Sequence, residues 1–416
     1  MAVPQELPVR SDRSPERAEL VPRFAKQGFD AESVADRRRW IERRTGGSLT
    51  HVGSYSIATG EMRGNIENPV GAVQVPVGLA GPLLIHGEHV RGVFYVPLAT
   101  TEGALVRSYE RGMTACTRAG GVSVRVTCDE NRVSPVFLFS DVAAACEFTV
   151  RVNESFDEIR AEAEATTGHG RLLRLDCQPV GREVIVHFCY FTGDAHGMNM
   201  IVKATEHACQ WILRHSRALD FQVFSGSSSE KRASGALFSG GKGKKAVAGA
   251  LLPASLLKHY LHVSPAELVE MWRHTVLGHL QAGALGYNGH YANGLAALFI
   301  ACGQDVANIV NSAVGITNFE VTENNDAYVS VTLPSLTVAT VGGGTGQGTA
   351  RECLQMLGAA GNGGALKLAE ITAATLLAGE ISMGAAIAGG EFVAAHELYG
   401  RNRPGDAGTI QNITFK

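Results

Sequence analysis

The sequence predicts an α+β protein, and three observations lead to this fold class. Helical periodicity alternates with short strand-like runs along most of the 416 residues. Residues 136–225 combine both into a strand–helix–strand–strand–helix unit, a pattern of half-split ferredoxin-like architecture. Residues 371–395 are the most apolar stretch and are rich in alanine and glycine, as in a tightly packed core helix. We therefore expect a large α/β-rich domain around a central helix, an inserted small ferredoxin-like domain and a helical N-terminal segment.

Domain boundaries follow from changes in these patterns. The helical N-terminal segment is expected over residues 1–55, where a charged helical pattern runs from Ala31 to Arg44. The small inserted domain is expected over residues 136–225. The large domain then comprises residues 56–135 and 226–416.

The remaining elements are predicted in chain order. Residues 102–119 have helical periodicity, with Thr100 or Thr101 available as the N-cap and Glu102 in the first turn. The inserted unit is expected to hold strands at 136–139, 172–177 and 183–191 and helices at 143–166 and 198–215. After a glycine- and serine-rich loop we expect helices at 265–285 and 292–302, strands at 316–320 and 327–333, a glycine run at 342–348 and a long final helix.

Composition and charge exclude several classes of protein. Charged residues make up 19% of the chain and the net charge is −3, without the basic footprint of a nucleic-acid binder. The short basic clusters at Arg37–Arg39 and at Lys242, Lys244 and Lys245 are interpreted as solvated faces. We therefore expect a compact enzyme that binds no nucleic acid.

Cysteine usage and hydropathy indicate the compartment. The eight cysteines are scattered without a C-x-x-C pair, which is typical of reduced thiols in the cytoplasm, and no metal site is expected. Residues 1–19 are charged and proline-rich, unlike a signal peptide. Glu380 and Glu391 interrupt the most apolar stretch, so it is interpreted as a core helix and no membrane contact is expected.

Four short stretches place a polar group among small or apolar residues: Thr101-Glu102-Gly103, Ser229-Glu230-Lys231-Arg232, Gly303-Gln304-Asp305 and Ala394-Ala395-His396. An isolated carboxylate in such surroundings loses hydration, so we expect the pKa of Glu102 to be raised toward values useful for proton transfer. Each residue alone also fits a satisfied buried polar group. Together they predict a catalytic constellation.

Two glycine-rich segments could receive an anion. Gly342-Gly343-Gly344-Thr345-Gly346 offers backbone N–H groups, although it lacks the G-x-G-x-x-G spacing and equally fits a tight turn. The segment Gly193–Met200 combines a loop with a helix start, whose N–H groups suit a pyrophosphate.

A family resemblance rests on several runs in the right order: Glu67-Asn68-Pro69, Pro76–Pro82, Ala99–Gly103, Gly193–Met200, Gly303-Gln304-Asp305, Thr340–Thr345 and the late His396. Over roughly residues 60–404 the chain resembles hydroxymethylglutaryl-CoA (HMG-CoA) reductase. The form Asp194-x-x-Gly-Met-Asn-Met is similar to the biosynthetic class I. The resemblance implies a soluble NADPH-dependent enzyme that reduces the HMG-CoA thioester to mevalonate and free CoA, with NADH left open as the cofactor.

The resemblance also implies residue roles. The catalytic residues would be Glu102, Lys231, Asp305 and His396. Cofactor binding would fall to Asp194, Gly197, Met198, Asn199, Gly342, Gly343 and Gly344, and substrate binding to Ser225, Glu230, Arg232, His290 and Asn293. The small domain would hold the nicotinamide cofactor and the large domain HMG-CoA. The implied assembly is a homodimer or higher homo-oligomer with shared active sites, and a closing segment from His396 onward.

Some positions depart from the family pattern. Glu230 and Arg232 replace the aspartate and lysine that usually flank the catalytic lysine. Val133 stands where the family has an arginine, with Arg132 one residue early and thus on the other face of a strand. His196 replaces the usual methionine of the cofactor loop. These departures leave two alternatives: a reductase of a related acyl-CoA thioester, or a non-catalytic CoA-binding homologue.

Overall fold

The computed structural model describes residues 19–24 and 28–393. The chain separates into two compact units, one up to Gln74 and one from Val75 onward. Each unit is described by itself below. The three-part division expected from the sequence stays a prediction.

The first unit is organised around α1 (Ala31–Thr45) and a short 3₁₀-helix (Thr59–Met62). Helix α1 begins where Asp30 accepts a hydrogen bond from the Ser33 amide and ends at Gly46, whose φ is +72°. This confirms the helix expected from Ala31. Arg37, however, is not solvated: it is buried, and its guanidinium donates to the carbonyl oxygens of Pro22 (3.0 Å), Gly28 (2.8 Å) and Pro69 (3.2 Å). The guanidinium thus donates hydrogen bonds to carbonyl oxygens of three residues that lie outside α1.

The second unit contains one continuous set of strands. They are β1 (Val77–His86), β2 (Arg91–Ala99), β3 (Val122–Val133), β4 (Val136–Leu138), β5 (Arg171–Val180), β6 (Glu183–Phe191), β7 (Asp220–Gln222), β8 (Gly243–Leu252), β9 (Ile316–Val321) and β10 (Ala327–Leu336). The main strand order is β7-β4-β6-β3-β8-β10-β9, with β1 paired to β2 and β3, and β5 to β6. Strand β3 is shared: residues 123–130 pair with β8, and residues 131–133 pair with β6.

Helices cover this sheet system. They are α2 (Leu105–Arg118), α3 (Val142–Glu154), α4 (Phe156–Glu164), α5 (Met198–His215), α6 (Ala254–Leu256), α7 (Pro265–Ala282), α8 (Tyr291–Ala301), α9 (Ile309–Ser312), α10 (Gly348–Met356) and α11 (Ala365–Ala388). A five-residue π-helix (Leu257–Leu261) follows α6, and short 3₁₀ turns lie at Gly235–Ser239, Val306–Asn308 and Gly343–Gly346. The mixed helix and strand content confirms the α+β class.

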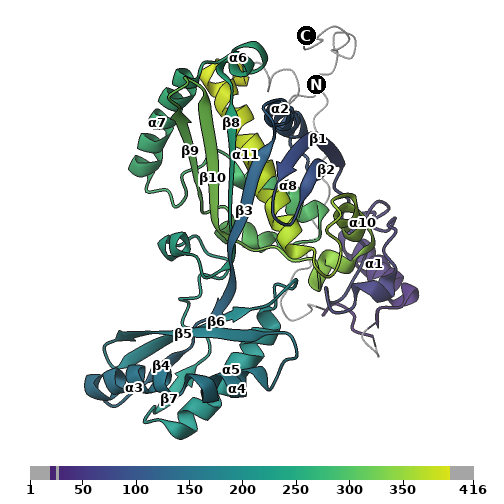
Figure 1. Cartoon of the computed structure of the whole chain (residues 1–416). Helices are drawn as coiled ribbons and strands as arrows, with labels where there is room; N and C mark the ends of the chain where they lie inside the picture. Colours follow the sequence, from purple (N-terminus) through teal and green to yellow (C-terminus); the bar gives the residue numbers. More distant parts are fainter. Residues whose placement is uncertain (1–18, 25–27, 394–416) are drawn as a thin grey trace. The chain divides into compact units, whose positions relative to one another are not determined.

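Helix α11 is the centre of the larger hydrophobic core. It contacts β3, β8 and β10 of the sheet and helices α2, α7 and α8 (Figure 1). Glycine permits the closest approach, because a Cβ on Gly112 of α2 would lie 1.8 Å from the carbonyl oxygen of Ala378. Among the described residues, α11 alone is long and apolar enough to cross a membrane, yet 83% of its apolar window is buried inside the protein. The central core helix expected from the sequence is confirmed.

A second, separate hydrophobic core lies within residues 133–223. It contains Phe137, Phe148, Phe188 and Ile201 and is enclosed by α3–α5 and β4–β7. The strand–helix–strand–strand–helix order expected here is confirmed, with two corrections. The single helix expected over 143–166 is two helices interrupted at Ser155, and β7 was not expected.

Candidate active site

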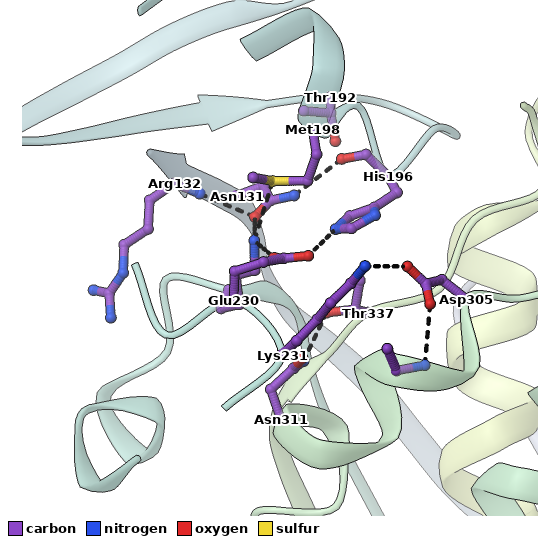
Figure 2. A network of polar contacts seen from close by, with 12 residues as sticks. Asn131, Arg132, Thr192, His196, Met198, Glu230, Lys231, Asp305, Asn311 and Thr337 are labelled. Carbon is purple, nitrogen blue, oxygen red and sulfur yellow. Dashed lines mark hydrogen bonds and ion pairs between the residues drawn. The ribbon is translucent and has the colours of Figure 1, made fainter. Parts of the chain in front are cut away.

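Two of the predicted catalytic residues meet directly. Lys231 Nζ lies 2.8 Å from Asp305 Oδ2, and the two side chains are 45% and 43% exposed (Figure 2). The hydrogen bond that Lys231 donates to Asp305 raises the pKa of Lys231, against the opposing effect of burial. Residues 74 positions apart therefore form one charged, solvent-accessible pair.

Local backbone geometry presents both side chains. Lys231 lies in the loop between β7 and the Gly235–Ser239 turn, with a left-handed φ of +53°, and Ser229 has a φ of +58°. Such conformations are uncommon for residues with a Cβ and mark a tightly constrained loop. Asp305 caps the Val306–Asn308 turn, since its Oδ1 accepts from the Ala307 amide at 3.0 Å. One carboxylate oxygen is thus fixed by the backbone while the other holds the lysine.

The substrate-binding residues predicted beside Lys231 differ in placement. Ser225 Oγ donates to the carbonyl oxygen of Ser134 at 2.7 Å, which ties the start of the loop to the end of β3. Arg232 is exposed. Its substrate role, like that of Ser225, stays a prediction.

Glu102 lies elsewhere than the sequence pattern suggested. Helix α2 begins at Leu105, after Ala104 with a φ of +69°, so Glu102 precedes the helix instead of occupying its first turn. Thr100 does not cap the helix; its Oγ1 accepts from the Glu102 amide at 2.9 Å. The expected burial of Glu102 is also wrong, since the residue is exposed. Gly103 and the left-handed Ala104 turn the chain before the helix can form.

Asn293 forms a hydrogen bond with Glu102. Its Nδ2 donates to Glu102 Oε1 at 3.3 Å from the first turn of α8. Within residues 19–24 and 28–393 no ion pair joins Glu102 to Lys231. Two of the predicted site residues, one catalytic and one substrate-binding, thus form a second contact near α8.

His290 is positioned by a residue whose role sequence reasoning missed. Its backbone amide donates to Glu380 Oε1 at 2.8 Å, while Glu380 Oε2 accepts from the Gly289 amide at 2.8 Å and from Thr317 Oγ1 at 2.7 Å. The His290 ring lies 5.2 Å from the Tyr109 ring. Glu380 is 2% exposed. The signal was available, since a lone carboxylate inside an apolar helix needs partners of this kind.

A network of polar contacts adjoins the lysine loop, which is the segment 223–234 that carries Lys231 (Figure 2). Glu230 forms an ion pair with Lys242, and its Oε1 lies 3.7 Å from His196 Nε2. Lys242 Nζ also donates to Asn131 Oδ1 at 2.7 Å, and the Lys242 side chain is 0% exposed. Burial opposes ionisation of Glu230, but the nearby His196 side chain and the charge of Lys242 outweigh it and lower the pKa of Glu230 to about 2. Glu230 is thus an ionised carboxylate whose partners are protein groups.

This network corrects the interpretation of the second basic cluster. Lys242 and Lys244 are both buried, and Lys244 Nζ pairs with Asp129 Oδ1 at 3.1 Å. Burial is the largest influence on Lys242 and lowers its pKa, opposed by Glu230. The partners lie outside this stretch of sequence, on β3 and in the lysine loop, so the local pattern of glycine and lysine could not show the burial.

The two segments predicted for cofactor binding lie together. The carbonyl oxygen of Asp194 accepts from the Thr340 amide at 2.9 Å and the Val341 amide at 3.2 Å, and Ala195 forms a parallel bridge with Val341. The Asp194 carboxylate accepts from the amides of Gly363 (2.8 Å) and Ala365 (2.9 Å) at the start of α11. Asp194 therefore joins the Gly193–Met200 segment to the large core, and its carboxylate is already engaged by the protein.

Open space exists at several glycines of these segments, three of which have positive φ. A Cβ at Gly193, Gly342 or Gly343 would meet no atom within 4 Å, and all three have positive φ. Gly344 differs, because a Cβ there would lie 2.8 Å from the carbonyl oxygen of Gly303. Helix α5 starts nearby at Met198, after Gly197 with a φ of +73°, and Asn199 is exposed in its first turn. Open glycine backbone beside a helix N-terminus fits the phosphates of a nicotinamide dinucleotide.

The register of β3 settles the position of Arg132. Arg132 pairs with Cys189 and Val133 with Phe188, without a bulge at this point. Val133 is buried, and Arg132 takes the opposite face, with its side chain directed away from Lys231 and Asp305 (Figure 2). His396, the fourth predicted catalytic residue, lies outside the described residues.

Comparison with solved structures first defines the class of fold. A class II 3-hydroxy-3-methylglutaryl-CoA reductase from Streptococcus pneumoniae, solved with NADPH in open conformations, matches with a TM-score of 0.65. The match covers 88% of this chain and 100% of the other, at 18% sequence identity. At this identity the likeness shows the fold alone.

Sequence comparison then identifies the family. Residues 33–401 match the family described as hydroxymethylglutaryl-coenzyme A reductase. A reductase of that name from Methanothermobacter thermautotrophicus is 42% identical over 373 residues, covering 89% of this chain and 94% of the relative. One from Haloferax volcanii is 40% identical over 380 residues, covering 89% and 94%. The chain therefore belongs to the hydroxymethylglutaryl-coenzyme A reductase family, and it is closer to these archaeal members than to the class II structure.

Proposed function

We propose that this protein reduces the thioester of HMG-CoA to mevalonate and free CoA with NADPH, through a hemithioacetal and an aldehyde. The proposal draws on family membership and on one observation in particular, the half-exposed Lys231–Asp305 pair at 2.8 Å. When the thioester carbonyl is reduced, negative charge develops on its oxygen. A preorganised ammonium at that oxygen lowers the barrier.

The four predicted catalytic residues each receive a part in this scheme. Lys231 stabilises the oxygen, and Asp305 orients the ammonium and keeps it protonated. Glu102 donates a proton, and Asn293 orients its carboxylate through the contact at 3.3 Å. His396 protonates the departing CoA thiolate, an ordinary thiol that leaves more readily as the neutral species.

NADPH, when bound, supplies the hydride for both reductions. We place its pyrophosphate over Gly193, Gly342 and Gly343, where side chains would otherwise fill the open space, and near the N-terminus of α5. Residues 136–225 then form the cofactor-binding domain and the surrounding large domain binds HMG-CoA. Asp194 acts by holding the loop on α11, through its two amide contacts.

A stoichiometric assay tests the function. Purified protein incubated with HMG-CoA and NADPH should oxidise two NADPH per CoA released, and a parallel series with NADH ranks the two cofactors. Lys231→Ala serves as the matched negative control. Absence of turnover with either cofactor would refute the proposal and favour a non-catalytic CoA-binding homologue.

A second candidate function is the reduction of a related acyl-CoA thioester. The observation that favours it is the regular register of β3, which buries Val133 and leaves Arg132 directed away from Lys231. The distal carboxylate of HMG-CoA then lacks the arginine that the family usually supplies, and the exposed Arg232 is the remaining candidate. Turnover of acyl-CoAs without that carboxylate, at kcat/KM equal to or above that of HMG-CoA, would establish this alternative.

We further propose a cytoplasmic homodimer or higher homo-oligomer with shared active sites. The exposure of Lys231 and Asp305, each near one half, leaves them available to a second subunit. All eight cysteines are free thiols, in keeping with a reducing compartment. Light scattering on active enzyme measures the assembly, and a fully active monomer would refute it.

A further inference from the structure

Lys242 is a buried cation that the proposed chemistry does not use. Its side chain is 0% exposed, at the turn before β8. Its ammonium pairs with Glu230, donates to Asn131 Oδ1 at 2.7 Å and contacts Met198 Sδ at 3.2 Å. A buried ammonium is costly unless it is paired. The three partners of Lys242 therefore compensate for the burial of its charge.

The partner of Lys242 is the immediate chain neighbour of Lys231. Glu230 is bound on one side by Lys242 and approached by His196 Nε2 at 3.7 Å, while Lys231 binds Asp305 at 2.8 Å. Two adjacent residues of opposite charge thus have separate partners. Without Lys242, the Glu230 carboxylate would compete with Asp305 for the Lys231 ammonium, because unlike charges this close in the chain attract strongly outside bulk water.

We infer that Lys242 is a positioning residue for the proposed reaction: by holding Glu230, it keeps the Lys231 ammonium directed at Asp305 and at the thioester oxygen. The inference rests on the proposed function. The network reaches the end of β3 through Asn131 and the start of α5 through Met198, and His196 lies in the segment proposed to bind cofactor. Lys242 therefore also joins the lysine loop to the proposed cofactor segment.

The charged groups around this network determine what a substitution does. Besides Lys231, these are Glu230, His196 and Asp305, together with Arg132, whose charge acts on Lys242. Lys242→Met removes a positive charge and frees a carboxylate. The charge of Glu230, which already raises the pKa of Lys231, is then no longer offset by Lys242, so the alkaline limb of the pH–rate profile should move to higher pH.

A double-mutant cycle tests the inference. Wild type, Lys242→Met, Glu230→Gln and the double variant are assayed for kcat, KM and pH profile with HMG-CoA and either nicotinamide cofactor. We expect Lys242→Met to lower kcat about 10- to 100-fold at nearly constant KM, and the double variant to regain about tenfold of that loss. Lys242→Arg, which keeps the charge, should stay within about fivefold of wild type.

Several outcomes would overturn the inference. Lys242 would be merely structural support if the kcat losses of the two single variants multiplied in the double variant, or if the alkaline limb of the pH–rate profile did not move. The same conclusion would follow from a kcat loss equal to the unfolded fraction measured by circular dichroism. The double variant removes both charges of the pair, so it remains measurable even where Lys242→Met folds poorly.

A crystal structure of Lys242→Met gives a readout that needs no turnover. The inference requires Glu230 to move toward Lys231 and the Lys231–Asp305 contact to lengthen; unchanged positions would contradict it. An inactive wild type with this rearrangement intact would refute the proposed function but not the positioning role.

Discussion

Two ion pairs that begin one residue apart in the chain serve different ends. The Lys231–Asp305 pair is close to half exposed and made of groups free to meet a substrate. In the Glu230–Lys242 pair the lysine is fully buried and the glutamate is 19% exposed. An exposed pair contributes little to stability, while breaking a buried one leaves an unpaired charge in a poor solvent. The same kind of ion pair can therefore serve chemistry or hold a residue in position, according to its access to water.

The largest expected effect is on the exposed pair. Lys231→Met should lower kcat by about 10²- to 10³-fold or more, as for the loss of one oxyanion-stabilising donor. Its thermal unfolding midpoint should stay close to that of wild type, because the lost pair is solvent-screened. Steady-state kinetics and calorimetry on the same preparation measure both. A large drop in the unfolding midpoint of Lys231→Met would contradict the assignment of the Lys231–Asp305 pair to chemistry and not to stability.

Acid should reveal the buried pair. The folded-state pKa of Glu230 is about 2, below its ordinary value of 4.5, so this group contributes stability above pH 4.5 that is lost as pH falls toward 2. Linkage puts the contribution on the order of 2–3 kcal/mol. Urea unfolding from pH 6 down to the lowest pH at which the protein stays native should show a steeper loss for wild type than for Glu230→Gln. Parallel curves would contradict the assignment.

Lys244 offers a matched control for Lys242. It is buried near the start of β8, and its ammonium pairs with Asp129 Oδ1 at 3.1 Å. Among the residues that the structure describes, no ion pair joins it to the lysine loop. Lys244→Met should cost about 1–2 kcal/mol of unfolding free energy. Its kcat should remain within about twofold of wild type, since the pair lies outside the site. A kinetic loss equal to that of Lys242→Met would show that any buried cation here affects turnover.

The smallest effect is expected at the base of the loop. Ser225→Ala removes the hydrogen bond to the Ser134 carbonyl and should cost about 1 kcal/mol of unfolding free energy. KM for HMG-CoA should rise no more than about threefold, because the loss of one neutral hydrogen bond within the protein is modest. A much larger rise in KM, without loss of stability, would instead assign Ser225 to substrate contact.

Local patterns predicted some elements closely and others not at all. Helix α5 has the expected bounds of 198–215, because its periodicity and its glycine start are both encoded within the segment. Strand β8 was missed, since its sequence from Gly243 is rich in glycine, alanine and lysine and is poor in β-branched residues. Its strand form depends on β3 and β10 on either side, which no local pattern displays.

The site divides in the same way. Lys231 and Asp305 were identified through family motifs, and the structure brings them into contact. The burial of Lys242 and the backbone role of Glu380 escaped prediction, because each depends on partners outside its own stretch of sequence. Glu102 was expected in a helix that the left-handed Ala104 prevents from starting there.

Strand β3 carries a mechanical consequence. This one strand pairs with β8 up to Glu130 and with β6 from Asn131. The change of partner falls at Asn131, whose side-chain Oδ1 also accepts a hydrogen bond from Lys242. Any rotation of the part of the chain that holds the second hydrophobic core must therefore twist strand β3. Such a rotation would reach the lysine loop through the hydrogen bond of Lys242 with Asn131 and the ion pair of Lys242 with Glu230.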